Sequence, residues 1–258
     1  MSLVDLANTF RNQLSSGDTI TLDSASLSSS GAVNIAGLIS LMEKQLDITA
    51  PGSIAISGLQ SADIPVPVRS LAIIKGTSTF LNTQLQVNNL VFTLDGSNNL
   101  DFYLEVTITD LNWTFGKSFP SGATFTELDG FYKNAEFIFS TYTLLPWPRY
   151  PNLSLKQGLN FYSELDLKDP TSPIFVLGAF LAFFSGGAAG STPSLFGQID
   201  IANTIQGDES QASLPTINLV TPNISQSADS FNLFGFLHVK NPRIAVKTIT
   251  FEDEEPSS

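Results

Sequence analysis

The strongest constraint on the fold is a strict alternation of apolar and polar residues in the segment 100–109. The apolar side chains recur at every second position, as Leu100, Phe102, Leu104, Val106 and Ile108. Successive side chains of a β-strand point to opposite faces of the sheet. The pattern therefore predicts a strand with one buried face and one polar face.

The preceding segment predicts the partner of this strand. Apolar residues alternate from Leu81 onward, and the phase of the alternation changes at Asn88 and Asn89, as a β-bulge would change it. The intervening sequence Asp-Gly-Ser-Asn-Asn, which starts at Asp95, is typical of a hairpin turn. We therefore expect a hairpin over residues 80–109, with a core formed by Phe92, Leu94, Phe102, Leu104 and Val106.

The return strand of this hairpin has three similar segments further along the chain. They occupy residues 159–167, 193–201 and 231–239, and the fourth position is aromatic each time: Tyr103, Tyr162, Phe196 and Phe234. We expect all of them to be strands in related environments. Repeated strand–turn–strand units cannot bury an apolar face alone, so they must pair or stack with one another.

These segments carry a resemblance to known proteins. Residues 158–167, Gly-Leu-Asn-Phe-Tyr-Ser-Glu-Leu-Asp-Leu, and the later Phe-Gly copies resemble repeat modules of very large, uncharacterised β-rich microbial proteins. The likeness covers roughly residues 80–250. It implies a repetitive β architecture, and it supplies no activity and no site residue.

Two helices are expected before the β-rich part, over residues 4–14 and 32–46, because apolar residues recur there at spacings of three and four. The predicted fold is mainly β, with antiparallel repeated strand–turn–strand units curled into a barrel or sandwich and the two N-terminal helices packed on them. Residues 1–50 form the helical segment, residues 51–251 form a single β-rich domain with a Pro-rich loop at 146–151, and residues 252–258 form an acidic tail.

Composition excludes several classes of function. The chain has 12 Lys plus Arg against 24 Asp plus Glu, a net charge of −12, so nucleic acid is not an expected partner. There is no cysteine, the one histidine is His238, and no Gly-rich phosphate-binding motif is present, so we expect no cofactor. The N-terminus does not have the pattern of a secretory signal and no apolar run is long enough to span a bilayer, so the cytoplasm is favoured.

Carboxylates provide the catalytic and metal candidates. Glu105 and Glu164 occupy matching positions of two similar segments, where a pair of carboxylates could act on a glycoside. A solvated polar face explains the same residues. Asp95, Asn99 and Asp101 alternate at the spacing of calcium ligands, but the glycine and glutamate of a calcium loop are missing, and a polar hairpin turn explains them as well.

Aromatic residues provide the candidates for binding. Trp113, Phe115, Phe137, Phe139, Tyr142 and Trp147 belong to an aromatic-rich region that predicts an apolar ligand cavity, a recognition surface or a filled core. The apolar run 174–184 contains Phe180, Phe183 and Phe184, which fit either a membrane-inserting loop or a buried strand.

From these patterns we expect a non-enzymatic β-rich module. It would bind an apolar small molecule, a lipid or a membrane surface, or it would self-assemble. The alternative is a carbohydrate-binding or carboxylate-dependent carbohydrate-active protein.

Overall fold

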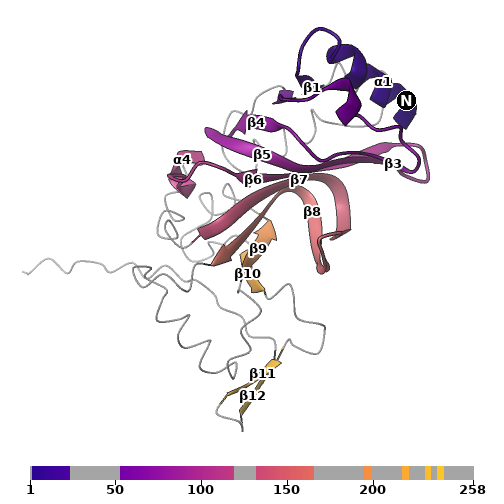
Figure 1. Cartoon of the computed structure of the whole chain (residues 1–258). Helices are drawn as coiled ribbons and strands as arrows, with labels where there is room; N and C mark the ends of the chain where they lie inside the picture. Colours follow the sequence, from indigo (N-terminus) through magenta and orange to yellow (C-terminus); the bar gives the residue numbers. More distant parts are fainter. Residues whose placement is uncertain are drawn as a thin grey trace, which may run out of the picture.

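A computed structural model describes residues 2–23, 53–118, 132–165, 194–198, 217–220, 230–233 and 237–240. This part of the chain is mainly β, and all of its strand pairs are antiparallel, as predicted (Figure 1). The second predicted helix, the apolar run 174–184 and the acidic tail lie outside the described residues. None of the described helices is long and apolar enough to cross a membrane.

The main sheet has eight strands in the order β10-β9-β8-β7-β6-β5-β3, and β4 pairs with β5 beside β3. Their bounds are β3 Ser70–Ile73, β4 Thr77–Phe80, β5 Thr83–Leu94, β6 Leu100–Ile108, β7 Tyr132–Trp147, β8 Tyr150–Leu165, β9 Ser194–Gln198 and β10 Ile217–Val220. The strands form an open path, so of the two predicted alternatives, a barrel or a sandwich, the described part of the chain does not form a closed barrel.

The hairpin of β5 and β6 confirms the prediction from the alternating segments. Phe92 lies opposite Phe102, and the register shifts between Val87 and Asn89, where the phase of the sequence changes. In the turn, Asp95 accepts hydrogen bonds from the backbone N–H groups of Ser97 and Asn99 at 2.8 and 2.7 Å. Of the five expected core residues, Phe92, Phe102, Leu104 and Val106 are buried and Leu94 is partly buried.

One face of this hairpin was expected to be polar, and that expectation is wrong. Tyr103 and Glu105 lie between the core positions of β6, yet both are buried. The cause is non-local, because the hairpin of β7 and β8 supplies a second apolar cluster that covers this side of the sheet. We call the side of the sheet covered by α1 the first face and the side that contains Glu105 the second face.

The hairpin of β7 and β8 is long and strongly bent. Each strand has 16 residues, and the register shifts between Lys133 and Glu136 and again between Ser140 and Leu144. Such irregularities bend a strand and increase its twist. Figure 1 shows β7 and β8 curving away from β5 and β6, toward the side where β9 lies.

The prolines of residues 146–151 lie in the tip of this hairpin. Trp147 pairs with Tyr150 across a turn of Pro148 and Arg149, so the expected Pro-rich loop is a two-residue turn flanked by strand residues. Pro146 and Pro151 are tolerated there because a hairpin tip does not demand ladder hydrogen bonds on its outer side.

The first face is covered by α1 (Leu3–Gln13), which confirms the first predicted helix, and by the two-stranded sheet of β1 (Ile20–Asp23) and β2 (Ser53–Ile56). Ser2 caps α1, because its side chain accepts from the N–H of Asp5 and the Asp5 carboxylate accepts from the N–H of Ser2. Phe10 of α1 contacts Phe92 of β5, with ring centroids 5.6 Å apart.

The predictions for the three similar segments have different outcomes. Residues 159–165 lie in β8 and residues 194–198 form β9, so both are strands where described. Residues 231–239 were expected to form one strand, and this is wrong, because the structure divides them between β11 (Ser230–Leu233) and β12 (Leu237–Lys240), which pair with each other. His238 lies in β12.

Candidate functional site

The second face of the main sheet carries a compact aromatic cluster. Its buried members are Tyr103, Ile138, Trp147, Leu153, Leu155, Tyr162 and Phe196. Tyr162 and Phe196 lie opposite each other on β8 and β9, and Trp147 stacks on Phe196 at 5.7 Å. Three of the four aromatics that align in the sequence, Tyr103, Tyr162 and Phe196, thus meet on one face.

Two carboxylates lie within this aromatic surrounding. Glu105 of β6 pairs with Ile138, and Glu136 of β7 pairs with Thr107, so the two glutamates are diagonal neighbours on the same face. Their side chains are 2% and 3% exposed. A charge buried to this extent must be paired or hydrogen-bonded, because its transfer from water is otherwise very costly.

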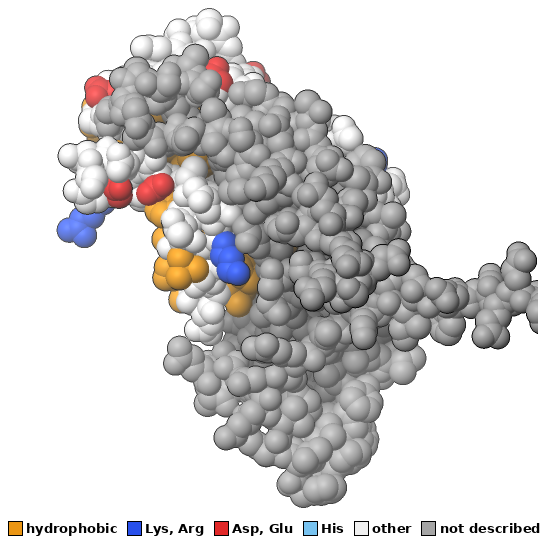
Figure 2. Space-filling model, turned by 180° about the vertical axis from the view of Figure 1, so that it is seen from behind, with side chains coloured by type: hydrophobic (Ala, Val, Ile, Leu, Met, Phe, Trp, Pro, Cys, Tyr) orange, Lys and Arg blue, Asp and Glu red, His pale blue; other side chains and the backbone are white. Residues whose placement is uncertain are grey.

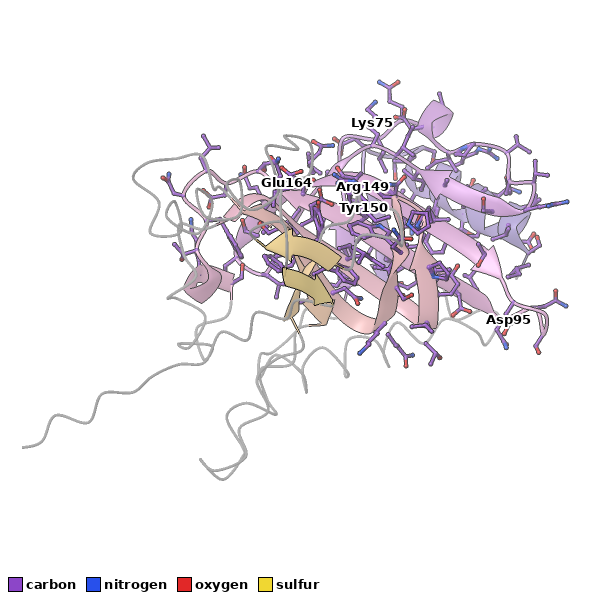
Figure 3. All side chains as sticks on the ribbon, turned by 90° about the horizontal axis from the view of Figure 1, so that it is seen from below. Lys75, Asp95, Arg149, Tyr150 and Glu164 are labelled. Carbon is purple, nitrogen blue, oxygen red and sulfur yellow. The ribbon has the colours of Figure 1, made fainter. Side chains whose placement is uncertain are left out.

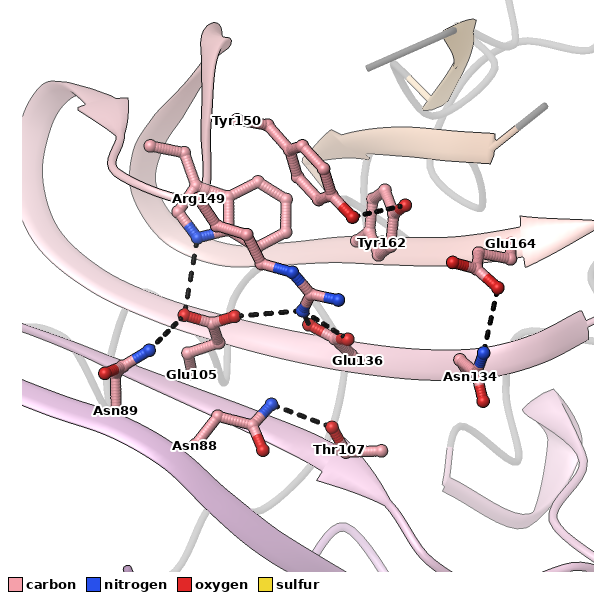
Figure 4. Close-up of polar contacts among 11 residues, drawn as sticks. Asn88, Asn89, Glu105, Thr107, Asn134, Glu136, Arg149, Tyr150, Tyr162 and Glu164 are labelled. Carbon is pink, nitrogen blue, oxygen red and sulfur yellow. Dashed lines mark hydrogen bonds and ion pairs between the residues drawn. The ribbon is translucent and has the colours of Figure 1, made fainter. Parts of the chain in front are cut away.

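Arg149 provides that pairing from the turn of the β7–β8 hairpin. Its Nη1 lies 2.6 Å from both carboxylate oxygens of Glu136 and 3.2 Å from Oε1 of Glu105 (Figure 4). Glu105 Oε2 accepts a hydrogen bond from Asn89 Nδ2 at 3.0 Å and a longer one from Trp147 Nε1 at 3.4 Å. Residues from β5, β6, β7 and the turn therefore meet at one point.

Three aromatic rings surround the same guanidinium. The Cζ atom of Arg149 is 5.1 Å from the ring centroid of Tyr150, 5.7 Å from that of Tyr162 and 5.9 Å from that of Trp147. The two tyrosines are joined by a 3.1 Å hydrogen bond, which Tyr162 donates. Rings at these distances attract a cation through their π faces. We call Glu105, Glu136, Trp147, Tyr150 and Tyr162 together the Arg149 cage.

The charges of the cage do not balance, because two carboxylates face one guanidinium. Burial, together with a smaller effect of the Glu105 charge, outweighs the opposing effect of Arg149 and raises the pKa of Glu136 to about 7. Burial would lower the pKa of Arg149, but its hydrogen bond to Glu136 and the charge of that carboxylate outweigh this and raise it. Burial and the charge of Glu105 raise the pKa of Tyr103 to about 12.

The two carboxylates predicted as a pair are not partners in the structure. Glu105 faces Glu136, whereas Glu164 of β8 is half-buried and accepts a 2.8 Å hydrogen bond from Asn134 (Figure 4). Sequence reasoning missed Glu136 and Arg149. One signal was present for Glu136, which is a single acidic residue inside the otherwise apolar run Ala-Glu-Phe-Ile-Phe that starts at Ala135.

The aromatic residues predicted to bind a ligand are divided between the two faces. Phe137 and Phe139 are buried in the first-face core, Trp113 is half-buried against it, and Trp147 is buried on the second face. The half-buried Tyr142 packs beside the second-face cluster and hydrogen-bonds Thr93. Phe115 lies in α4 (Phe115–Ser118). Their binding role stays a prediction, and that of Phe180, Phe183 and Phe184 lies outside the described residues.

Two of the three predicted oxygen ligands, Asp95 and Asn99, bind each other in the hairpin turn, and the third, Asp101, binds a residue of β7. Besides its two backbone donors, Asp95 accepts from the side-chain amide of Asn99 at 2.9 Å, and these bonds lower the pKa of Asp95. Asp101 accepts from Thr141 at 3.0 Å. Within the described ranges, no group of three His, Cys, Asp or Glu residues could hold a metal ion. Figure 3 shows Asp95 at the end of the sheet, away from Arg149 and Tyr150.

A different feature lies at the β3 edge of the sheet. The residues 65–74, here called the apolar edge segment, expose Val66 (76%), Val68 (92%) and Ile74 (72%). Both ends of the segment are anchored, because Lys75 forms an ion pair with Asp63 at 3.1 Å and Arg11 donates to the carbonyl of Ile64 at 2.9 Å. Figure 2 shows the molecule from behind, where hydrophobic side chains lie at the described surface next to Lys or Arg side chains.

Comparison of the chain with protein-family models, with curated proteins and with solved structures finds no match.

Proposed function

We propose that the chain is a non-enzymatic β-rich module that associates with a second copy of itself through the apolar edge segment. The observation that carries the proposal is the exposure of Val66, Val68 and Ile74 next to the edge strand β3. Isolated exposed apolar residues are normal on a protein surface, whereas several on one short segment are a feature of interaction sites.

The chemistry of β3 supports strand pairing. Among the described residues, β3 pairs only with β5, so its other edge is open to a further strand. Natural edge strands are commonly protected by a charge, a proline or a bulge. The sequence of β3, Ser-Leu-Ala-Ile, contains none of these, and the nearest prolines, Pro65 and Pro67, lie outside the strand.

Charge opposes a second copy less strongly at this place than elsewhere on the chain. With a net charge of −12, two copies repel each other over most approaches. The segment 61–75 is an exception, because it carries Arg69 and Lys75 against the single acid Asp63. Antiparallel pairing of β3 with β3 would present the same surface from both copies, as a two-fold dimer requires.

The alternatives have weaker support. The carboxylates Glu105 and Glu136 are held by Arg149 and are almost fully buried, so a sugar substrate has no access to them in this arrangement. An apolar ligand or lipid would need an unfilled cavity, and the buried aromatic rings instead contact one another in both cores.

Sedimentation velocity and native mass spectrometry of the wild-type chain and of Val68→Asp test the proposal. We expect a concentration-dependent dimer for the wild type and a monomer for Val68→Asp, because a charge at the interface opposes pairing. Leu111→Asp is the matched control, since Leu111 is 100% exposed and lies outside the segment, and it should dimerise like the wild type.

A wild-type monomer at every concentration, or equal dimerisation of Val68→Asp and the wild type, would contradict the proposal. A monomer that carries the added mass of a lipid would favour the apolar-ligand alternative.

A further inference from the structure

The Arg149 cage has the composition of a site for a planar cation. Its two carboxylates come from β6 and β7, and its three rings come from the ends of the hairpin strands and from β8. The guanidinium comes from the turn between those strands. Arg149 is also more exposed than the two carboxylates, with 39% of its side chain accessible against 2% and 3%.

We propose that the Arg149 cage is a guanidinium-binding site that Arg149 occupies in cis, and that the arginine side chain of a partner protein can occupy it in place of Arg149. This site is separate from the apolar edge segment, and the proposal does not depend on self-association.

The geometry favours a guanidinium over other cations. A guanidinium is flat, donates several hydrogen bonds in one plane and stacks on aromatic rings, whereas an ammonium group is a compact and more strongly hydrated charge. Arg149 uses one nitrogen to contact both carboxylates while its Cζ lies against three rings. A single nitrogen of an ammonium group could also reach both carboxylates, so the contacts with three aromatic rings are what favour a guanidinium.

The charge balance explains why the cage needs an occupant. Without a cation, two buried carboxylates would face each other in an apolar surrounding, which is strongly unfavourable. Replacement of Arg149 by another arginine restores the same contacts, so the remaining cost of exchange is that of association. Arg149 belongs to the two-residue turn, whereas the carboxylates and rings belong to strands, so the exchange requires movement of the Arg149 side chain.

The first experiment is chemical rescue of Arg149→Ala. We expect a lower thermal midpoint for this variant and a saturable recovery with millimolar guanidinium chloride, well below denaturing concentrations. Methylammonium chloride should give less recovery, and sodium chloride at equal ionic strength should give none. Lys75→Ala is the control, because it removes an ion pair outside the cage, and guanidinium should not stabilise it. Equal recovery of Arg149→Ala with all three salts would overturn the proposal.

The second experiment measures the partner's arginine directly. A short arginine-containing peptide and its citrulline counterpart are titrated against the wild type, Arg149→Lys and Arg149→Ala by isothermal calorimetry. Since a cis occupant lowers the apparent affinity by the fraction of open cage, Arg149→Ala should bind the arginine peptide at least about tenfold more tightly than the wild type. Arg149→Lys, whose ammonium group makes fewer ring contacts, should bind it with an intermediate affinity. The citrulline peptide should not bind. Arg149→Lys serves as the folded variant with a weaker cis occupant in case Arg149→Ala does not fold. Arginine-peptide binding that is no tighter in either variant than in the wild type would overturn the proposal.

Discussion

The two faces of the main sheet exclude water in different ways. On the first face, α1 and the β1–β2 pair cover the sheet with hydrocarbon and phenyl groups, such as those of Leu6 and Phe10. On the second face, the bent β7–β8 hairpin brings aromatic rings together with Glu105, Glu136 and Arg149. One sheet thus combines an apolar core with a core that contains two carboxylates and a guanidinium.

The difference predicts different responses to mutation and to pH. The free energy of apolar burial depends on area and packing and involves no proton binding. The stability that the first face contributes should therefore not change with pH. Buried carboxylates couple folding to proton binding, so the second face should respond to pH. The following variants test this comparison, in order of decreasing effect.

The largest effect is expected for Phe92→Ala on the first face. Phe92 is fully buried and contacts both Phe10 and Phe102, so the variant leaves a cavity under α1. We expect a loss of about 3–5 kcal/mol in the free energy of unfolding, measured in urea and equal at acidic and neutral pH. Leu111→Ala, at a fully exposed position outside the apolar edge segment, is the control and should change little. A loss below about 1 kcal/mol would mean that the first face is not a packed core.

Arg149→Ala on the second face should cost somewhat less, about 2–4 kcal/mol, because the side chain is partly exposed. The loss arises from two buried carboxylates left without a cation, so it should be larger above neutral pH than below it. The double variant Arg149→Ala/Glu136→Gln removes one of those charges and should be more stable than Arg149→Ala alone. If the double variant lost as much unfolding free energy, relative to the wild type, as Arg149→Ala and Glu136→Gln lose in sum, the carboxylates would not be coupled to Arg149.

A smaller effect is expected for Ser2→Ala, which removes the side-chain half of the N-terminal cap of α1. We expect a loss of about 1 kcal/mol without any change in the pH response. Hydrogen exchange should locate the loosening in the first turn of α1, and loosening of β7 or β8 instead would show that the two faces are not independent.

The elements that the sequence predicted correctly are those set by local pattern. The β5–β6 hairpin follows from alternation and turn residues, and its bulge follows from the phase change at Asn88 and Asn89. The first helix follows from apolar spacing. The second face was missed because it depends on the bend of β7 and β8, and two register shifts that set this bend have no clear mark in the sequence.

The candidate site was predicted only in part for the same reason. Glu105 was identified, but its partner is Glu136, which lies beyond a long connection, rather than Glu164 of the similar segment. Arg149 was not predicted because the prolines on either side of it indicated a loop. Nothing in the sequence indicated that its side chain folds back over the sheet. Contacts across a bent sheet cannot be read from a repeat of strand patterns alone.

The most direct test of the account is the difference in unfolding free energy between the wild type and Glu136→Gln as a function of pH. The pKa of Glu136 is about 7 in the folded chain against 4.5 ordinarily, so between these values the folded state holds a proton that the unfolded state has released. The wild type should therefore lose stability relative to Glu136→Gln as pH rises through this window, by at most about 1.4 kcal/mol per pH unit, and the difference should level off above it. A difference that stays constant across the window, or one that favours the wild type as pH rises, would contradict a second face that contains an excess buried carboxylate.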